Sequence, residues 1–251
     1  MKAPKENIII ISDVDDVLVD SLRAHHAAAE RQAQDRGWEV PGIKLFCQAG
    51  GTVILENLPG FLEYHQQNLL SPEFNTSLEP LADALSARDF LAATLALYLT
   101  ARPNSLNEVT RKHLIGLGFP DRPVIGRPDS VSMENTAPWK YAELAAIAEG
   151  LNRHNGPDRQ GLTRIIFVDD SYKTVQFVND KGHPLINAYT YEGLGTPQHG
   201  ERGVYPINWQ QIMMRYKGQL KAVITGHYPS VMYHLTPFQS NGHHNRPSQA
   251  R

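Results

Sequence analysis

The chain has 251 residues, of which 41% are hydrophobic and 20% are charged. This composition is typical of a folded globular protein and excludes the low-hydrophobicity, high-charge pattern of intrinsic disorder. With 24 basic and 26 acidic side chains, the formal net charge is −2. The overall charge therefore gives no reason to expect binding to a membrane surface or to a long nucleic acid.

Cysteine content and hydropathy bear on the cellular compartment. The single cysteine, Cys47, cannot form an internal disulfide, which favours a reducing compartment. The first apolar run, Ile8–Ile11, is too short for the core of a signal peptide, and no run of 18 apolar residues occurs. We therefore expect a cytoplasmic protein without a membrane span. No feature of the sequence predicts the oligomeric state.

Five short apolar runs predict the strands of a parallel sheet. The first, Ile8–Ile11, is β-branched and does not alternate with polar residues, which is typical of a strand covered by helices on both faces. The others lie at Leu95–Leu99, Val124–Ile125, Arg164–Val168 and Leu185–Tyr189. Helical patterns lie between most of them, and this alternation predicts an α/β fold built from βαβ units.

Four helices in this part of the chain have recognisable ends. A capping box at Ser105–Glu108 begins the first, and Gly116 and Gly118 end it. The others are a helix with Pro138 in its first turn, a helix capped by Ser171 that ends near Gly182, and a helix from Asn208 to about Tyr216. The aromatic and methionine stripe of the last helix is typical of core packing.

The segment 21–80 lacks the βαβ pattern. It combines an Ala-rich helical stretch, a Gly50-Gly51 break and several aromatic residues, so we expect a mostly helical insertion after the first strand. Five of its side chains are candidates for contact with a substrate, with the surface or the interior of the insertion as the alternative places for them. They are Arg23, His25, His26, Lys44 and Gln48. The tail at 238–251 has no large apolar residue and is predicted to be disordered. The predicted core is then 1–20 and 81–237.

Acidic residues follow two of the buried strands. Asp13 and Asp15 are two apart on an extended chain and point to the same side, while Asp169 and Asp170 end the fourth predicted strand. In open parallel sheets the carboxyl ends of the strands form the ligand site. Converging carboxylates need a cation, and oxygen ligands favour Mg²⁺. An alternative interpretation of the first pair is a polar turn. For the second pair it is helix capping by Asp170 or Ser171, which is compatible with metal binding.

Three further residues supply donors at the same edge. Thr100 ends the second strand, and Lys140 lies early in the helix that contains Pro138, so together they offer a phosphate a hydroxyl and a cation. Arg102 either assists with the phosphate or pairs with a carboxylate or a helix end. Asp16 points to the other side of the chain from Asp15 and is expected to form hydrogen bonds within the turn.

The order of these parts resembles the four motifs of haloacid dehalogenase (HAD) superfamily phosphatases. The matching residues are Asp13-Val-Asp-Asp-Val17, Thr100, Lys140 and Asp169-Asp170. The resemblance covers about 1–20 and 81–190. It implies a Rossmann-like three-layer core with a parallel sheet and the first strand in its centre, and it makes 21–80 a cap inserted after the first motif.

The resemblance also implies roles for these residues. Asp13 would be the nucleophile that forms an aspartyl-phosphate, and Asp15 the general acid and then base. Mg²⁺ would be held by Asp13, by the main-chain carbonyl of Asp15 and by Asp169 or Asp170. Thr100 and Lys140, with Arg102, would hold the phosphate oxygens. The expected activity is hydrolysis of a small phosphate ester, either a metabolite or a nucleotide.

Other functions would use some of the same residues. A carbon–halogen hydrolase does not need Asp15, since a halide leaves without a proton, so Asp15 favours a phosphate ester. A phosphonate hydrolase would need a cap lysine for a Schiff base, and Lys44 is the candidate. A receiver domain places its phosphorylated aspartate on a middle strand, whereas here acidic pairs come both before and after Thr100 and Lys140. A catalytically weak protein of this fold that binds a phosphorylated ligand or a protein partner is the main alternative.

Overall fold

The computed structural model describes residues 7–34, 37, 39–48, 71–153, 162–198 and 200–216. The predicted disordered tail at 238–251 lies outside the described residues. Five strands form one parallel sheet in the order β3-β2-β1-β4-β5. Their bounds are Asn7–Ser12 (β1), Leu95–Pro103 (β2), Val124–Arg127 (β3), Thr163–Asp169 (β4) and Ile186–Thr190 (β5). The predicted α/β fold with the first strand in the centre is confirmed.

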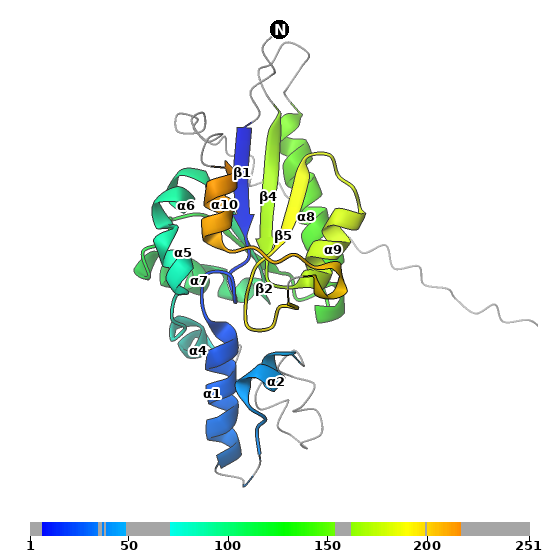
Figure 1. Cartoon of the computed structure of the whole chain (residues 1–251). Coiled ribbons are helices and arrows are strands. Elements are labelled where there is room, and N and C mark those ends of the chain that lie inside the picture. The colour runs from blue at the N-terminus through cyan, green and yellow to red at the C-terminus, as the bar shows by residue number, and fades with distance from the viewer. Residues whose placement is uncertain are drawn as a thin grey trace, which may run out of the picture.

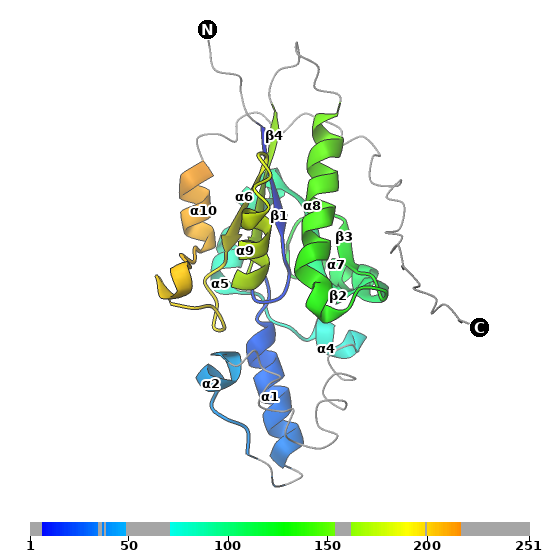
Figure 2. The ribbon, with the colours of Figure 1, turned by 90° about the vertical axis from the view of Figure 1, so that its right-hand side faces the viewer.

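Helices cover both faces of this sheet (Figures 1 and 2). Alternate residues of β1 pack on opposite sides: Ile8 and Ile10 belong to one apolar core, Ile9 and Ile11 to the other. This explains why the strand is apolar at every position. The first core includes α5 (Ala82–Ser86), α6 (Arg88–Thr94), α7 (Asn107–Gly116) and α10 (Trp209–Tyr216). The second includes α8 (Thr136–Asn152) and α9 (Tyr172–Asp180).

Helix ends agree with the sequence in two places and differ in one. The Ser171 side chain caps α9 by accepting a hydrogen bond from the Thr174 N–H, and Gly182, with φ of 64°, follows its end. The predicted capping box at Ser105 is wrong. Ser105 lies within a short 3₁₀ helix at Asn104–Leu106, and α7 begins after Leu106 without a side-chain cap. Trp209, Ile212 and Tyr216 of α10 are buried, as a core stripe requires.

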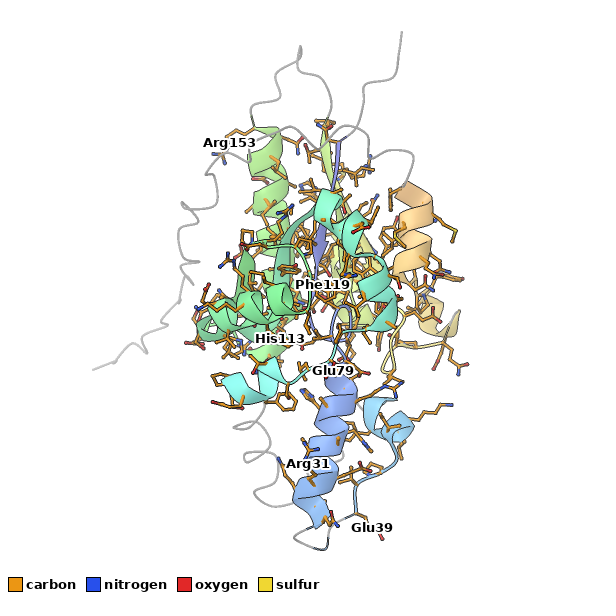
Figure 3. The ribbon with its side chains drawn as sticks, turned by 90° about the vertical axis from the view of Figure 1, so that its left-hand side faces the viewer. Arg31, Glu39, Glu79, His113, Phe119 and Arg153 are labelled. Atoms are coloured by element: carbon orange, nitrogen blue, oxygen red, sulfur yellow. The ribbon has the colours of Figure 1, made fainter. Side chains whose placement is uncertain are left out.

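The segment after β1 leaves the sheet at its carboxyl edge. Helix α1 (Ser21–Gln34) extends away from the core with α2 (Ile43–Gln48) beside it, and α4 (Pro72–Thr76) lies near its base (Figures 1 and 2). The chain departs and returns side by side, because the Asp20 N–H donates to the Glu79 carbonyl and the Leu81 N–H to that of Leu18. Figure 3 shows Glu79 and His113 at this junction and Arg31 and Glu39 at the far end of the extension.

None of the helices in these described ranges is long and apolar enough to cross a membrane. Two further 3₁₀ turns lie at Met133–Asn135 and Glu201–Gly203.

Candidate active site

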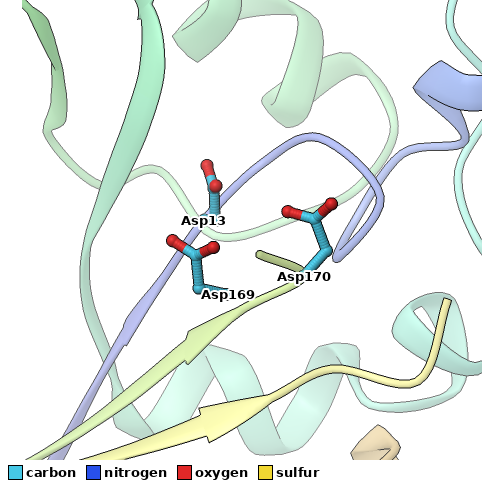
Figure 4. A group of neighbouring side chains, drawn as sticks. All are labelled: Asp13, Asp169 and Asp170. Atoms are coloured by element: carbon cyan, nitrogen blue, oxygen red, sulfur yellow. The ribbon is translucent and has the colours of Figure 1, made fainter. Parts of the chain in front are cut away.

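Three carboxylates meet at the carboxyl ends of β1 and β4. Asp13 directly follows β1, Asp169 is the last residue of β4 and Asp170 comes next. The two strands are neighbours, so chain segments more than 150 residues apart in sequence lie side by side. One oxygen of each carboxylate lies within 4.8 Å of the others, and Figure 4 shows the three groups gathered at this edge. The predicted convergence of acids at this edge is therefore present.

Lys140 connects two of these carboxylates. Its Nζ lies 2.6 Å from Asp13 Oδ2 and 2.7 Å from Asp169 Oδ2, and all three side chains are buried. The lysine reaches the site from α8. Burial lowers its pKa, but the two carboxylates outweigh burial and keep the pKa above its usual value. Lys140 therefore carries a positive charge beside Asp13 and Asp169.

The Asp13 carboxylate is held on both oxygens. The Val14 N–H donates to Oδ1 at 2.7 Å, and Lys140 donates to Oδ2. Burial raises the pKa of Asp13 to about 7, even though the charge of Lys140 acts in the opposite direction. Asp169 and Asp15 add to the increase because like charges disfavour the ionised form.

Asp15 is bound to Arg102. The guanidinium donates from Nε to Asp15 Oδ2 at 2.9 Å and from Nη2 to Oδ1 at 2.7 Å, which is a bidentate pair. Burial opposes ionisation of Asp15, but the charge and the hydrogen bonds of Arg102 outweigh it and hold the pKa of Asp15 below its usual value. The sequence left open whether Arg102 assists with a phosphate or pairs with a carboxylate or a helix end. In the structure Arg102 pairs with the Asp15 carboxylate.

Thr100 and Asp16 occupy supporting positions. Thr100 is buried within β2, and its hydroxyl accepts a hydrogen bond from the Arg102 N–H at 3.2 Å. Asp16 accepts from the N–H groups of Ser21 and Leu22 and from the Ser21 hydroxyl, so it caps α1. Its φ of 56° turns the chain sharply after Asp15. The expectation that Asp16 forms hydrogen bonds in the turn is confirmed.

The candidates in the insertion separate into distinct environments. His26 is buried beside Phe46 and bonds to the Pro41 carbonyl, so it belongs to the interior of the insertion. Arg23 pairs with Asp20 at 2.8 Å. His25 contacts the Phe74 ring, with centroids 5.1 Å apart, and its charge helps to lower the pKa of Asp15. The side chain of Gln48 lies outside the described residues.

The charges of the site fit a hard cation. If fully ionised, Asp13, Asp169 and Asp170 would carry three negative charges, against which Lys140 places one positive charge within hydrogen-bond distance of Asp13 and Asp169. Asp169 uses both oxygens, since Oδ2 accepts from Lys140 and Oδ1 from the Ser171 N–H. Within the described part of the chain no group donates a hydrogen bond to the Asp170 carboxylate. Burial and the neighbouring Asp169 raise the pKa of Asp170. A divalent ion on oxygen ligands would relieve this repulsion.

We expect the stability of the metal-free protein to fall as the pH rises from about 4 to about 7. The pKa values of Asp13 and Asp170 are raised by folding, so in this window the folded state binds more protons than the unfolded state, and the free energy of unfolding decreases with pH. Mg²⁺ should therefore raise the melting temperature more at about pH 7.5 than at about pH 5. At a Mg²⁺ concentration of about 100 times its Kd, the free energy of unfolding should increase by about 2.7 kcal/mol.

Thermal unfolding with EDTA and with Mg²⁺ at both pH values measures this effect. Asp170→Asn should reduce the response to Mg²⁺, whereas Asp121→Asn, on an exposed side chain paired with Arg111, should not change it. An equal response to Mg²⁺ at the two pH values would contradict the prediction.

A separate open cleft of about 560 Å³ is lined by Asp16 and by residues that follow it in the chain. Its described lining residues include Asp16, which caps α1, but not Asp13, Asp169 or Asp170. They are mainly polar or acidic, among them Asp20, Arg23, Asp83, Glu192 and Asn208. The cleft is therefore distinct from the candidate site.

Sequence reasoning missed three partners of the site. The Ser171 N–H holds Asp169, the Val14 N–H holds Asp13, and the Thr110 hydroxyl accepts from Arg102 Nη1 at 3.2 Å. The first two are main-chain contacts and have no signature in residue type. Thr110 is a polar residue that is fully buried in α7. The position of Thr110 on the apolar stripe of this helix was the sequence signal that could have indicated a buried polar contact.

The fold is that of known hydrolases. A HAD family hydrolase from Deinococcus radiodurans with bound phosphate and sodium matches at 12% identity and a TM-score of 0.56, covering 87% of this chain and 99% of that one. A HAD hydrolase from Bacillus subtilis bound to magnesium matches at 12% identity and 0.52, covering 85% and 100%. A proposed phosphatase from Clostridium difficile matches at 11% identity and 0.57, covering 84% and 99%.

These likenesses define the fold of the protein. No family model and no curated protein matches the sequence. The structural matches nevertheless extend over nearly the whole of the solved chains, and at 11–12% identity they show the fold. The chain therefore has the fold of the haloacid dehalogenase-like hydrolases, which confirms at the level of the fold the resemblance found in the sequence motifs.

Proposed function

We propose that the protein is a Mg²⁺-dependent phosphomonoesterase that acts through an aspartyl-phosphate intermediate. The observation that carries this proposal is the meeting of Asp13, Asp169 and Asp170 at the carboxyl edge of the sheet, with Lys140 bonded to the first two. Asp15 lies two residues after Asp13. These residue types are what transfer of a phosphoryl group to a carboxylate needs: a nucleophile, a proton-transfer group and compensating positive charge.

Asp13 would act as the nucleophile. One of its oxygens attacks phosphorus, a bond from that oxygen to phosphorus forms, and the bond from phosphorus to the ester oxygen breaks. Lys140 favours this step because its charge screens the Asp13 carboxylate from an anionic phosphate. The Thr100 hydroxyl would donate a hydrogen bond to a phosphate oxygen that does not react.

Asp15 would transfer protons in both halves of the reaction. It donates a proton to the departing ester oxygen, and it then takes a proton from the water that cleaves the aspartyl-phosphate. Arg102 favours the ionised form that the second step needs. A bound phosphate ester brings negative charge close to Asp15, which raises the pKa and favours the protonated form for the first step.

Asp13 and Asp170 would hold the metal ion by side-chain oxygens, the main-chain carbonyl of Asp15 would complete the protein ligands, and Asp169 would remain tied to Lys140 and Ser171. When bound, Mg²⁺ supplies charge neutralisation and orients the phosphate for in-line attack. The structure from Deinococcus radiodurans contains phosphate and sodium, and the structure from Bacillus subtilis contains magnesium. These ligands support a phosphate group and a metal ion as ligands of this chain.

The substrate would be a small phosphate ester, either a metabolite or a nucleotide. The near-neutral charge balance disfavours a long nucleic acid. The insertion 21–80 would act as a cap over a core formed by 1–20 and 81–237, since α1 begins at the Asp16 turn beside the site. A cytoplasmic location agrees with the single cysteine.

Release of inorganic phosphate from p-nitrophenyl phosphate tests the proposal. We expect turnover with Mg²⁺, its loss with EDTA and its recovery when Mg²⁺ is returned in excess. Calorimetry with phosphorylated small molecules provides the comparison. Binding of such ligands without any release of phosphate would contradict the proposal and favour a binding protein.

A further inference from the structure

The Arg102–Asp15 pair is distinguished by its burial and its geometry. Both oxygens of Asp15 accept from one guanidinium, at 2.9 and 2.7 Å, and the Arg102 side chain is only 5% exposed. Asp15 keeps 31% of its side chain accessible. A buried bidentate arginine thus holds a carboxylate that remains partly accessible to solvent.

Arg102 is itself fixed by three neighbours. Its Nη1 donates to the Thr110 hydroxyl at 3.2 Å, and its main-chain N–H donates to the Thr100 hydroxyl at 3.2 Å. At Gly126 of β3, a Cβ atom would lie 2.8 Å from the Arg102 carbonyl oxygen, so the two strands approach each other closely there. Thr110 of α7 therefore holds the guanidinium itself, while the Thr100 and Gly126 contacts hold the main chain that carries it.

We propose that Arg102 is a positioning residue for Asp15 rather than a phosphate-binding residue. This inference depends on the proposed function, in which Asp15 exchanges protons with the ester oxygen and with water. A carboxylate on a free side chain samples several rotamers, whereas a bidentate partner restricts it to one. When one Asp15 oxygen turns to the leaving group, the remaining hydrogen bond keeps the carboxyl aimed at it.

The two roles predict different kinetics. A phosphate-binding arginine contacts every phosphate ester in the same way, so its loss raises KM and affects all leaving groups alike. A residue that positions Asp15 matters in proportion to the need for proton transfer, so its loss lowers kcat for poor leaving groups and leaves KM nearly unchanged.

The experiment compares p-nitrophenyl phosphate with an alkyl phosphate such as glycerol phosphate. We expect Arg102→Ala to lose about 10²-fold in kcat on the alkyl ester, with a much smaller loss on the aryl ester, which follows the profile of Asp15→Asn. Millimolar guanidinium should restore part of the alkyl-ester activity of Arg102→Ala. Arg111→Ala is the matched control, because Arg111 forms the same bidentate geometry with Asp121, at 2.7 and 2.7 Å, on an exposed surface. It should keep its activity and show no response to guanidinium.

Two milder variants keep the test decisive if Arg102→Ala does not fold. Arg102→Lys keeps the charge but offers no planar fork, and Thr110→Val removes only the hydroxyl that fixes Nη1. Both should lose more on the alkyl ester than on the aryl ester. A loss that is equal for the two esters, or a large rise in KM, would overturn the positioning role. If the wild-type protein released no phosphate from either ester, the proposed function itself would fail and this inference with it.

Discussion

Asp13→Asn is expected to reduce phosphate release by at least about 10⁴-fold, the scale on which removal of a covalent nucleophile acts. The asparagine keeps the shape of the side chain and can still accept from the Val14 N–H or from Lys140, but its amide cannot form the acyl-phosphate bond. Steady-state release of phosphate from p-nitrophenyl phosphate measures the loss. Because one buried carboxylate is removed from a crowded group, the variant should unfold at a melting temperature no lower than that of the wild type near neutral pH.

A trapping experiment tests the same residue through a different signal. The wild-type protein mixed with substrate and quenched in acid should carry a phosphoryl group detectable by intact mass, and the Asp13→Asn variant should carry none. Asp121→Asn, at an exposed position paired with Arg111, serves as the control and should behave as wild type in both assays. Full activity of Asp13→Asn would rule out the covalent mechanism.

The sequence predicts the sheet well because burial on two faces leaves a strong pattern. A strand such as Ile8–Ile11 has no solvent-facing side, so apolar residues occupy every position and the run stands out. The acids at the ends of β1 and β4 follow from the same rule, since neighbouring parallel strands end at one edge. The strand order then brings Asp13 next to Asp169 without any further information.

The contacts between side chains could not be predicted in the same way. Lys140 lies 127 residues from Asp13, and Arg102 lies 87 residues from Asp15. Residue type indicates that each cation can bind an anion, but the choice of partner depends on how α8 and β2 pack against β1. Arg102 illustrates this: its sequence position permits a phosphate or a carboxylate, and in the fold its side chain contacts Thr110 and Asp15.

Local signals fail where tertiary structure changes a helix end. The residues at Ser105–Glu108 satisfy the pattern of a capping box, yet the chain forms a 3₁₀ turn there before α7 begins. The close approach of β2 and β3 at Gly126 brings Asn104 and Asn107 against the neighbouring strand. Packing against a strand, which the sequence does not reveal, therefore determines this helix start.

Lys140→Met is expected to destabilise the metal-free protein by about 3–5 kcal/mol near neutral pH, because it leaves two buried carboxylates without their shared cation. Methionine fills a similar volume, so the loss reflects charge rather than a cavity. Urea unfolding measures the change in the free energy of unfolding. Lys112→Met is the matched control, since Lys112 is exposed and its Nζ lies 3.5 Å from Glu108, and it should change that free energy by less than about 0.5 kcal/mol.

The pH dependence of this loss identifies its cause. Without Lys140 the pKa of Asp13 rises further, so the folded variant takes up a proton as the pH falls, and the destabilisation should shrink between about pH 8 and about pH 5. Mg²⁺ should recover part of the stability at the higher pH, because it replaces some of the missing positive charge. A loss that is the same at both pH values and insensitive to Mg²⁺ would show that Lys140 acts through packing alone. In that case its bonds to Asp13 and Asp169 would carry no part of the electrostatic balance that the proposed phosphoryl transfer requires.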